Sequence, residues 1–247
     1  MKEHYGNMFY EDQVTGSLSS ATEVLQVVFD IYRPKSLLDV GCGRGAWLLA
    51  AEKLGVDELH GIDGPWVKTT DLLSNKINFL SENLETKIPI SQRYDMAMSV
   101  EVAEHLSESS AQSLVSSLCA AADIVIFGAA VKAQGGENHI NEQRQSYWAN
   151  HFMTNNYCCL DIIRPKVWLN GSVDIWYRQN TLVYINNSRT DLIELFSNAE
   201  CGGMLDLIHP VMFENRERSR HLTLEKPSLR LILGLIRSYI YRVMRIN

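Results

Sequence analysis

A glycine-rich turn between a short apolar strand and a helix constrains this sequence more than any other feature. The apolar run Ser36–Val40 predicts a buried parallel strand, and Ala46–Leu54 predicts a helix. Between them stands Gly41–Gly45, which reads Gly-Cys-Gly-Arg-Gly and begins two residues after Asp39. Glycines at such a turn allow a tight bend and let the backbone approach a ligand closely. The turn therefore predicts an α/β sheet with a ligand site outside the carboxyl end of this strand.

The alternation of strands and helices continues along the chain. Further strands are expected at residues 58–62, 77–80, 94–100, 123–127, 157–163 and 181–185, and helices at 19–32, 107–121 and 143–155. Strands that alternate with helices of about 10–15 residues are typical of a parallel, doubly wound sheet. The segment Ala129–Asn141 has no clear periodicity, and a loop of that length is usually functional or mobile. We expect one domain over residues 1–226 and a separate segment over 227–247.

The composition of the 247 residues is that of a globular protein. Hydrophobic residues make up 46% and charged residues 21%, which excludes a disordered or coiled-coil chain. The longest apolar run, residues 124–131, has eight members, whereas a membrane-spanning helix needs about 20. The amino terminus leads into polar sequence without the apolar stretch of a secretory signal. The sequence therefore predicts a cytoplasmic protein. Its five cysteines are expected to be free thiols, because their number is odd and no Cys-x-x-Cys occurs.

The charge is unevenly distributed around a net value of −6. Residues 229–247 contain Arg230, Arg237, Arg242 and Arg245 and no acidic residue, so the other 228 residues carry −10. Because nucleic-acid binding requires a basic face, we expect no nucleic-acid partner. On a helix the four arginines fall on one side, opposite a wide apolar face. Such a basic amphipathic helix can pack on the domain, pair with a second copy in a homodimer, or lie on an anionic membrane surface.

An acidic residue after the second strand narrows the choice of ligand. Asp63 ends that predicted strand, 18 residues after Gly45, where a carboxylate can accept hydrogen bonds from two ribose hydroxyls. A dinucleotide site would instead have Gly-x-Gly-x-x-Gly, with a pyrophosphate at the helix start. Asp39 would repel a pyrophosphate but attract the ammonium group of an amino acid. The ligand should therefore combine a ribose with a cationic amino acid, which describes S-adenosylmethionine (SAM).

Residues from about 20 to 190 resemble the class I SAM-dependent methyltransferases. The glycine motif, Asp63 and the segment Tyr94–Leu106 match that family in order. The resemblance implies a Rossmann-like, doubly wound sheet of seven mainly parallel strands, with the glycine turn on the methionine part of SAM and Asp63 on its ribose. Where the family often has an aspartate near the adenine, this chain has Ser81–Leu84, and Asn83 can accept a hydrogen bond from the adenine amino group. The residues expected to bind SAM are Asp39, Gly41, Cys42, Gly43, Gly45, Asp63, Gly64, Asn83, Leu84 and Glu101.

Four side chains, one of which is also expected to bind SAM, are candidates for catalysis. Glu101, Glu104 and His105 follow the fourth strand, and His139 lies in the loop after the fifth, so all four should approach the same crevice. In one interpretation, His105 or His139 acts as a general base toward a hydroxyl. In another, the four residues bind Mg²⁺ or Mn²⁺, as in the metal site of the small-RNA 2′-O-methyltransferases, which this pattern resembles. A third interpretation is structural, with the glutamates capping or forming ion pairs and His105 packing against the helix.

Aromatic and amide side chains suggest the nature of the acceptor. The segment Trp168–Asn180 is dense in both, and Trp66, Tyr147 and Trp148 add further rings. Such side chains suit sugar rings, although ordinary core packing explains them equally well. Residues 135–143 and 176–180 resemble small methyltransferases of bacterial surface-glycan synthesis, which implies O-methylation of a sugar hydroxyl. The alternatives are a small secondary metabolite or phenol as the acceptor, or a catalytically silent scaffold with the SAM-binding fold.

Overall fold

The computed structural model describes residues 2–197, 204–225, 229, 232, 233 and 236. The chain divides into two compact units, Met1–Leu207 and Ile208–Asn247. The expected division at 226/227 falls within the second unit and stays a prediction. All of the predicted cofactor-binding and catalytic residues belong to the first unit.

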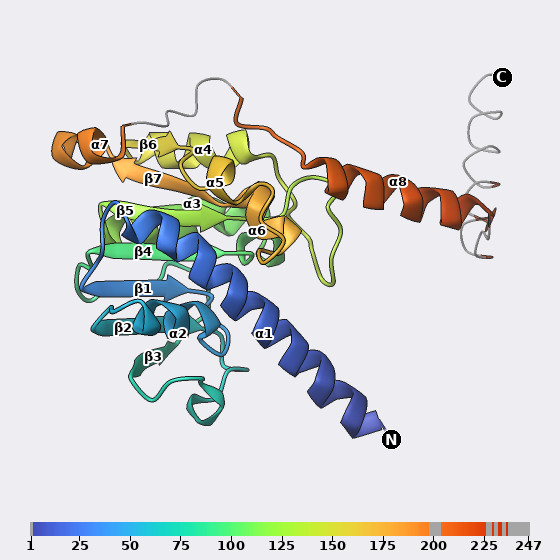
Figure 1. The fold of residues 1–247 in the computed structure, drawn as a ribbon, viewed down its shortest axis with the longest axis horizontal. Coiled ribbons are helices and arrows are strands. Elements are labelled where there is room, and N and C mark those ends of the chain that lie inside the picture. The colour runs from blue at the N-terminus through green and yellow to red at the C-terminus, as the bar shows by residue number, and fades with distance from the viewer. Residues whose placement is uncertain (1, 198–203, 226–228, 230–231, 234–235, 237–247) are drawn as a thin grey trace. The chain divides into compact units, whose positions relative to one another are not determined.

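The first unit is built on a seven-stranded sheet in the order β3-β2-β1-β4-β5-β7-β6 (Figure 1). The strands are β1 Ser36–Val40, β2 Glu58–Asp63, β3 Ile77–Ser81, β4 Met96–Val100, β5 Ile124–Gly128, β6 Tyr157–Leu160 and β7 Leu182–Asn186. All neighbouring strands are parallel except that β7 runs antiparallel to both β5 and β6. The predicted Rossmann-like sheet of seven mainly parallel strands is confirmed.

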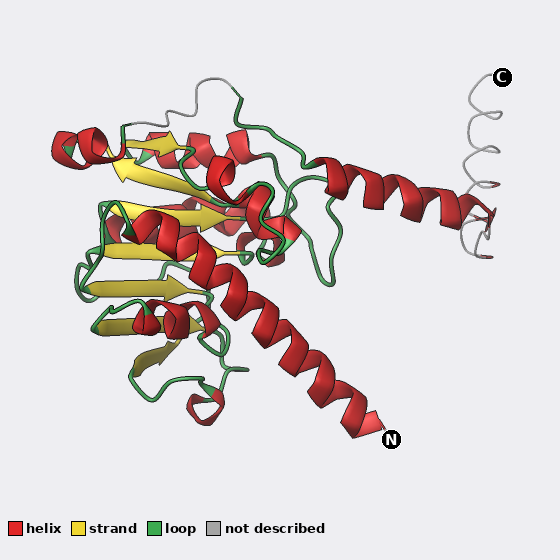
Figure 2. Ribbon diagram, in the orientation of Figure 1, coloured by secondary structure: helices red, strands yellow, loops and turns green. Residues whose placement is uncertain are grey.

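Helices flank both faces of this sheet (Figure 2). They are α1 Lys2–Phe29, α2 Ala46–Lys53, α3 Ala111–Ala121, α4 Gln145–Thr154, α5 Arg164–Val167, α6 Ile175–Asn180 and α7 Thr190–Phe196, with short 3₁₀ turns at Thr69–Asp71, Ala103–His105 and Glu108–Ser110. The expected start of α1 at Ser19 was wrong, because the helix begins at Lys2. The part before Ser19 contains Gly6, Gly16 and mixed polar sequence, so it lacks the apolar period on which the prediction relied.

Alternate side chains of the central strands enter two separate hydrophobic cores. In β1, Leu37 belongs to the core under α1 and α2, and Leu38 belongs to the core under α3 and α4. In β5, Ile126 and Phe127 divide in the same way. Burial on both faces is what makes such strands continuously apolar in sequence. Because both faces of the sheet are covered, the ligand crevice has to lie beyond the carboxyl ends of the strands.

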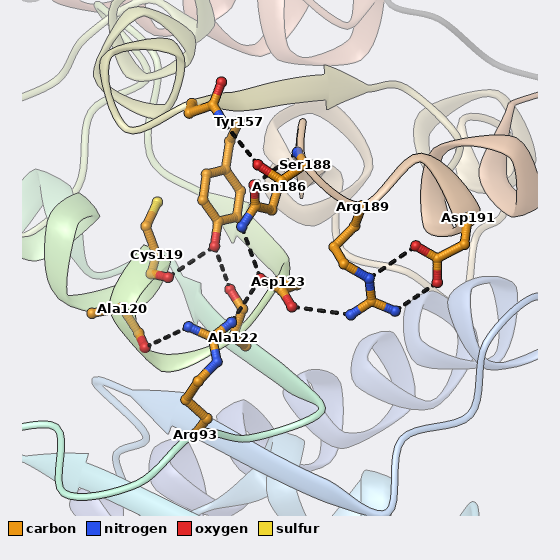
Figure 3. A network of polar contacts seen from close by, with 11 residues as sticks. Arg93, Cys119, Ala120, Ala122, Asp123, Tyr157, Asn186, Ser188, Arg189 and Asp191 are labelled. Atoms are coloured by element: carbon orange, nitrogen blue, oxygen red, sulfur yellow. Dashed lines mark hydrogen bonds and ion pairs between the residues drawn. The ribbon is translucent and has the colours of Figure 1, made fainter.

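A polar network lies at the other end of the sheet, where the parallel strand β5 begins, and it holds the antiparallel strand β7 (Figure 3). Asp123, just before β5, accepts hydrogen bonds from Arg93 at 2.6 Å, Arg189 at 3.0 Å and Asn186 at 2.9 Å. The hydroxyl oxygen of Tyr157 in β6 lies 2.6 Å from the carbonyl oxygen of Ala122. These contacts join the start of β5 to the end of β7 and the start of β6. The network thus stabilises the strand pair that departs from the parallel pattern.

The second unit contains a helix, α8 Pro210–Glu225, that the sequence analysis did not predict. Of the predicted basic amphipathic helix over 227–247, the structure describes only Leu229, Ile232, Leu233 and Ile236, and the other residues lie outside the described part. All four of these side chains are exposed, and all four residues are helical. Among the helices that the structure describes, none combines the length and apolarity that a membrane crossing demands.

Candidate active site

A cavity of about 870 Å³ opens at the carboxyl ends of β1, β4 and β5. Four segments of the first unit form its walls: the glycine turn with the start of α2, the end of β4, the loop after β5, and the facing parts of α1 and α6. The lining residues are Gly41–Arg44, Ala46, Trp47, Val100, Glu101, Glu104, His105, Gln134–Glu137, His139, Gly16, Ser17, Asp174, Trp176 and Tyr177. The cavity therefore contains all four predicted catalytic residues and the centre of the glycine turn.

The glycine turn leaves open space on the cavity side. Gly43 has a φ of +52°, and a Cβ atom built on it would have no neighbour within 4 Å. At Gly41, by contrast, a Cβ atom would lie 2.3 Å from the side chain of Val102. A side chain at Gly41 would therefore collide with Val102. At Gly43 the backbone instead faces an open space that a ligand can fill.

Asp63 is bonded to this turn. Its carboxylate accepts hydrogen bonds of 2.6 Å from the backbone N–H groups of both Gly43 and Gly64. The second buried acid, Asp39, lies in β1, and burial together with the nearby Asp63 raises its pKa well above the usual range. Neither carboxyl is among the residues that line the cavity. The raised pKa of Asp39 favours its neutral form, so this carboxyl adds little negative charge near the turn.

The other residues expected to contact SAM lie beside the cavity. Asn83 is exposed, and its side-chain oxygen accepts the Glu85 N–H at 3.0 Å, whereas Leu84 is buried in the core. A Cβ atom on Gly64 would meet the ring of Trp66 at 2.1 Å, and one on Gly45 would meet Ile77 at 2.5 Å. None of Gly45, Gly64, Asn83 and Leu84 lines the cavity, so their contacts with a cofactor stay predictions.

Three of the predicted catalytic side chains come together. Glu104, His105 and His139 each offer a ligand atom, and these atoms lie within 4.8 Å of one another. The two imidazole rings meet edge to face, with centroids 4.8 Å apart. Burial and the neighbouring His139 lower the pKa of His105. The cluster joins the end of β4 to the loop after β5, as the sequence predicted.

Glu104 is fully buried in this cluster. The backbone N–H groups of Glu104 and Ala130 and the Glu101 carboxyl lie near it, but no described group reaches hydrogen-bonding geometry with either Glu104 oxygen. Burial and the Glu101 carboxylate raise the pKa of Glu104 to about 9. A buried carboxyl without partners is costly, because it has lost its water and gained no replacement. A proton or a cation at this position would remove that cost.

Glu101 has different partners and stands outside the three-residue cluster. Its backbone has a φ of +56°, which is unusual for a residue other than glycine. Its carboxylate oxygens accept hydrogen bonds from Asn180 at 2.8 Å and from Gln134 at 3.1 Å. Burial raises the pKa of Glu101, while these two amides oppose the rise. Both Glu101 oxygens therefore accept hydrogen bonds from amides. Glu101 forms part of the cavity wall in this arrangement.

Another wall of the cavity is formed by α1 and the segment 174–177. The hydroxyls of Ser17 and Tyr177 are 3.1 Å apart, and the hydroxyl of Ser20 accepts the Asp174 N–H at 2.9 Å. Trp176 lines the cavity with 37% of its surface exposed. The Asp174 carboxylate also lines it and accepts no hydrogen bond from the described residues. This wall offers an aromatic face, a carboxylate and hydroxyls to a second ligand.

The structure separates the aromatic and amide residues that the sequence grouped together. Trp176 and Tyr177 reach the cavity, but Trp148 is a core residue that packs against Phe127, and Trp66 and Trp168 are not among the lining residues. The side chains of Gln179 and Asn180 are buried, and Asn180 binds Glu101. The suggestion that these two amides meet a sugar is therefore wrong, because they serve the protein interior.

Sequence reasoning missed several residues of the site. Gln134, Glu142 and Asn180 hold the predicted catalytic side chains, and Ser17, Asp174 and the amino-terminal helix complete the cavity. The signals for the first group were the amides and acids of residues 134–143 and the amides of the segment Trp168–Asn180. No local pattern pointed to Ser17, because its place in the wall depends on the packing of α1 across the molecule.

Comparison with known proteins supports the fold. No protein-family model matches this sequence, and no curated protein matches it either. Among solved structures, magnesium protoporphyrin IX methyltransferase from Synechocystis PCC 6803 with bound SAH superposes with a TM-score of 0.54, at 16% identity over 69% of this chain and 84% of that chain. The plantazolicin methyltransferase BpumL with SAH gives a TM-score of 0.52, at 17% identity over 75% and 89%. Human N-acetylserotonin methyltransferase with SAM gives 0.50, at 12% identity over 68% and 51%. The chain therefore has the Rossmann-like fold of the class I SAM-dependent methyltransferases.

Proposed function

We propose that this protein is a SAM-dependent O-methyltransferase. The observation that carries the proposal is one cavity that joins the open glycine turn to the Glu104, His105 and His139 cluster. Bound SAM supplies an electrophilic methyl group on a cationic sulfonium. The proposed contacts are the Gly41–Gly43 backbone on the methionine part and Asp63 on the ribose. Two observations support this fit: the space in front of Gly43, and the hydrogen bond that holds the Asp63 carboxylate against the Gly43 N–H.

The histidines are the proposed acceptor-activating groups. A neutral imidazole of His105 or His139 accepts the proton of the acceptor hydroxyl as the oxygen attacks the methyl group. The lining residues hold the acceptor in line with the methyl group, and positioning of this kind can account for much of the rate.

A divalent cation is the second candidate for activation, and one observation favours it. The buried Glu104 carboxyl has no hydrogen-bond partner among the described residues and lies within 4.8 Å of both histidines, so a cation there would satisfy it. One carboxylate and two imidazoles suit Mn²⁺ better than Mg²⁺, which prefers oxygen ligands and retains water. A bound cation would lower the pKa of a coordinated hydroxyl. Glu101 would stand beside this ligand set, because its oxygens are held by amides.

The proposed acceptor is a hydroxyl of a sugar in a surface glycan or its precursor. In support, the cavity wall combines the partly exposed Trp176 with the carboxylate of Asp174 and the hydroxyl of Ser17. Aromatic faces stack on the C–H faces of sugars, and carboxylates accept hydrogen bonds from their hydroxyls. A small metabolite or a phenol is the alternative acceptor, and a SAM-binding scaffold without catalysis is the alternative function.

Mass spectrometry tests the proposal. The full-length protein is incubated with methyl-labelled SAM and a panel of sugar, phenol and metabolite acceptors, with and without Mn²⁺. We expect a sugar to gain one labelled methyl group. Methyl transfer to a phenol alone would show that the acceptor is a phenol and not a sugar. Binding of SAM without transfer to any member of the panel would favour the scaffold, and failure to bind SAM would refute the whole proposal.

We further propose that the protein works in the cytoplasm, at the inner face of the membrane. Leu229, Ile232, Leu233 and Ile236 are exposed at helical spacing, and residues 229–247 contain four arginines and no acid. An apolar helix face bordered by arginine suits an anionic lipid surface. Attachment there would bring the enzyme to lipid-linked glycan precursors. Packing of this helix on the domain and pairing with a second copy are the competing roles.

A further inference from the structure

One carboxylate organises the loop that carries His139. Glu142 lies three residues beyond the histidine, and its Oε1 atom is 3.0 Å from the Nδ1 atom of His139. The same carboxylate accepts the backbone N–H of Gly135 at 2.6 Å and that of Ala133 at 2.8 Å. Both side chains of the pair are largely buried, with 12% of His139 and 18% of Glu142 exposed. Water therefore competes little for these contacts.

We propose that Glu142 is a positioning residue for His139. By accepting a hydrogen bond from Nδ1–H, it fixes the tautomer in which the Nε2 atom of His139 is unprotonated. A neutral imidazole has one donor and one acceptor nitrogen, so a proton held on Nδ1 leaves the lone pair on Nε2. That lone pair is what either a general base or a metal ligand needs. The role of Glu142 is thus the same in both candidate mechanisms.

The backbone of this loop shows why the carboxylate is needed. Ala133 has a φ of +70° and Asn138 a φ of +59°, and neither conformation is favoured for these residues in an unconstrained chain. Gly135, between them, also has a positive φ of +75°. The N–H groups of Ala133 and Gly135 both converge on Glu142, and such converging donors form an anion-binding concavity. The carboxylate therefore sets the loop conformation and the imidazole orientation together.

A glycine lies against the Nε2 side of the His139 imidazole. A Cβ atom on Gly136 would lie 2.2 Å from the Nε2 atom of His139, so any larger residue would displace the ring. His105, the other imidazole of the cluster, lies near the backbone carbonyl of Asn138 instead. Only His139 is paired with a carboxylate, as in the carboxylate–histidine arrangements that orient imidazoles at metal and catalytic sites.

Nitrogen NMR of the full-length protein tests the inference without a cofactor or acceptor. The ¹⁵N shifts of the imidazole distinguish the two neutral tautomers, with His139 assigned from its loss in the His139→Ala variant. At pH 8 we expect the wild-type His139 to be protonated on Nδ1 and unprotonated on Nε2. A wild-type His139 that carries its proton on Nε2 would overturn the inference, whatever the variants do.

Three variants distinguish the hydrogen bond of Glu142 to His139 from the effect of a nearby negative charge. Glu142→Ala should give the mixture of tautomers typical of an unconstrained histidine, while Glu142→Gln should largely keep the wild-type tautomer, because its amide oxygen can still accept the Nδ1 proton. Glu137→Gln removes a neighbouring carboxylate that has no hydrogen bond among the described residues, and it should leave the His139 spectrum unchanged. An unchanged tautomer in folded Glu142→Ala, or an equal change in Glu137→Gln, would contradict the role of Glu142. Absence of SAM binding would refute the proposed function but leave these results standing.

Discussion

At the scale of single residues, the cofactor assignment depends on Gly43 and Asp63. Gly43→Val places a branched side chain in the space that faces the cavity, at a φ that such a residue resists. Asp63→Ala removes the carboxylate that is proposed to bind the ribose, together with its hydrogen bonds to the Gly43 and Gly64 backbone. A hydrogen bond from the ribose to this carboxylate would contribute about 1.5–3 kcal/mol. We expect both variants to fold and to bind SAM at least about tenfold more weakly by calorimetry, since about 1.4 kcal/mol corresponds to tenfold.

Gly171→Val is the matched control for the glycine. A Cβ atom at Gly171 also has no neighbour within 4 Å, but this residue has no positive φ and does not line the cavity. Its SAM affinity should equal that of the wild type. Unchanged affinity in both Gly43→Val and Asp63→Ala would remove the cofactor site from this turn.

Substitution of the two histidines should lower turnover much more than it weakens SAM binding. His139→Ala and His105→Ala are expected to lower turnover by about 100-fold or more, since general acid–base catalysis contributes about 10²–10⁴-fold. Their SAM affinity should change much less. Steady-state kinetics combined with SAM calorimetry provides the comparison, and a loss of affinity as large as the loss of turnover would make the histidines binding residues instead.

Chelation decides between the two roles of the cluster. If Glu104, His105 and His139 hold a cation, EDTA should abolish turnover and Mn²⁺ should restore it, and Glu104→Gln should prevent the restoration. Full activity after exhaustive chelation would eliminate the cation and leave the general base.

Much of this residue-level picture could be predicted, and the missing part has a physical reason. Glu101, Glu104, His105 and His139 were found because strand ends in an α/β sheet converge on one edge. Glu142, Gln134 and Asn180 were not, because their roles depend on hydrogen bonds within an aperiodic loop and between distant segments. Asn180 binds Glu101 across 79 positions of sequence, and no local pattern encodes such a pair.

At the scale of secondary-structure elements, the antiparallel strand β7 depends on Asp123. Burial raises the pKa of Asp123, but the hydrogen bond from Asn186 and the charges of Arg93 and Arg189 outweigh it and hold the pKa below its usual value. A lowered folded-state pKa stabilises the fold above the unfolded-state pKa of about 3.9, and this stability is lost as the pH falls through the folded-state value.

Asp123→Asn should therefore lower the free energy of unfolding by about 1–3 kcal/mol at pH 7, by the loss of charge-assisted hydrogen bonds. The difference from the wild type should shrink as the pH falls below about 4. Urea unfolding at several pH values measures it. Asp191→Asn, which removes an exposed partner of Arg189, is the control and should have a much smaller effect. A difference that is constant across this pH range would contradict the electrostatic explanation.

The elements themselves were predicted to different degrees. The strands and the helices α2, α3 and α4 were located because their apolar patterns are long enough to read. The short helices α5, α6 and α7 span only four to seven residues, too few for a periodic pattern. The antiparallel direction of β7 was not predicted, because a strand has the same alternation of side chains whichever way it runs.

At the scale of the whole molecule, the basic carboxyl-terminal segment is predicted to bind membranes. The full-length protein should co-sediment with anionic vesicles at low salt, whereas a chain that ends at Lys226 should not. Neutral vesicles and high salt are the controls, because both remove the electrostatic attraction. Equal sedimentation of the two chains would exclude the membrane role. A change of oligomeric state on truncation would indicate pairing, and loss of folding would indicate packing.

The most direct test of the central claim is a crystal structure of the full-length protein with SAH. The account predicts density for the ligand in the cavity, with its amino-acid part against the Gly41–Gly43 backbone, its ribose at Asp63 and its sulfur on the side of His105 and His139. An empty cavity at saturating SAH, or a ligand bound elsewhere on the protein, would contradict it.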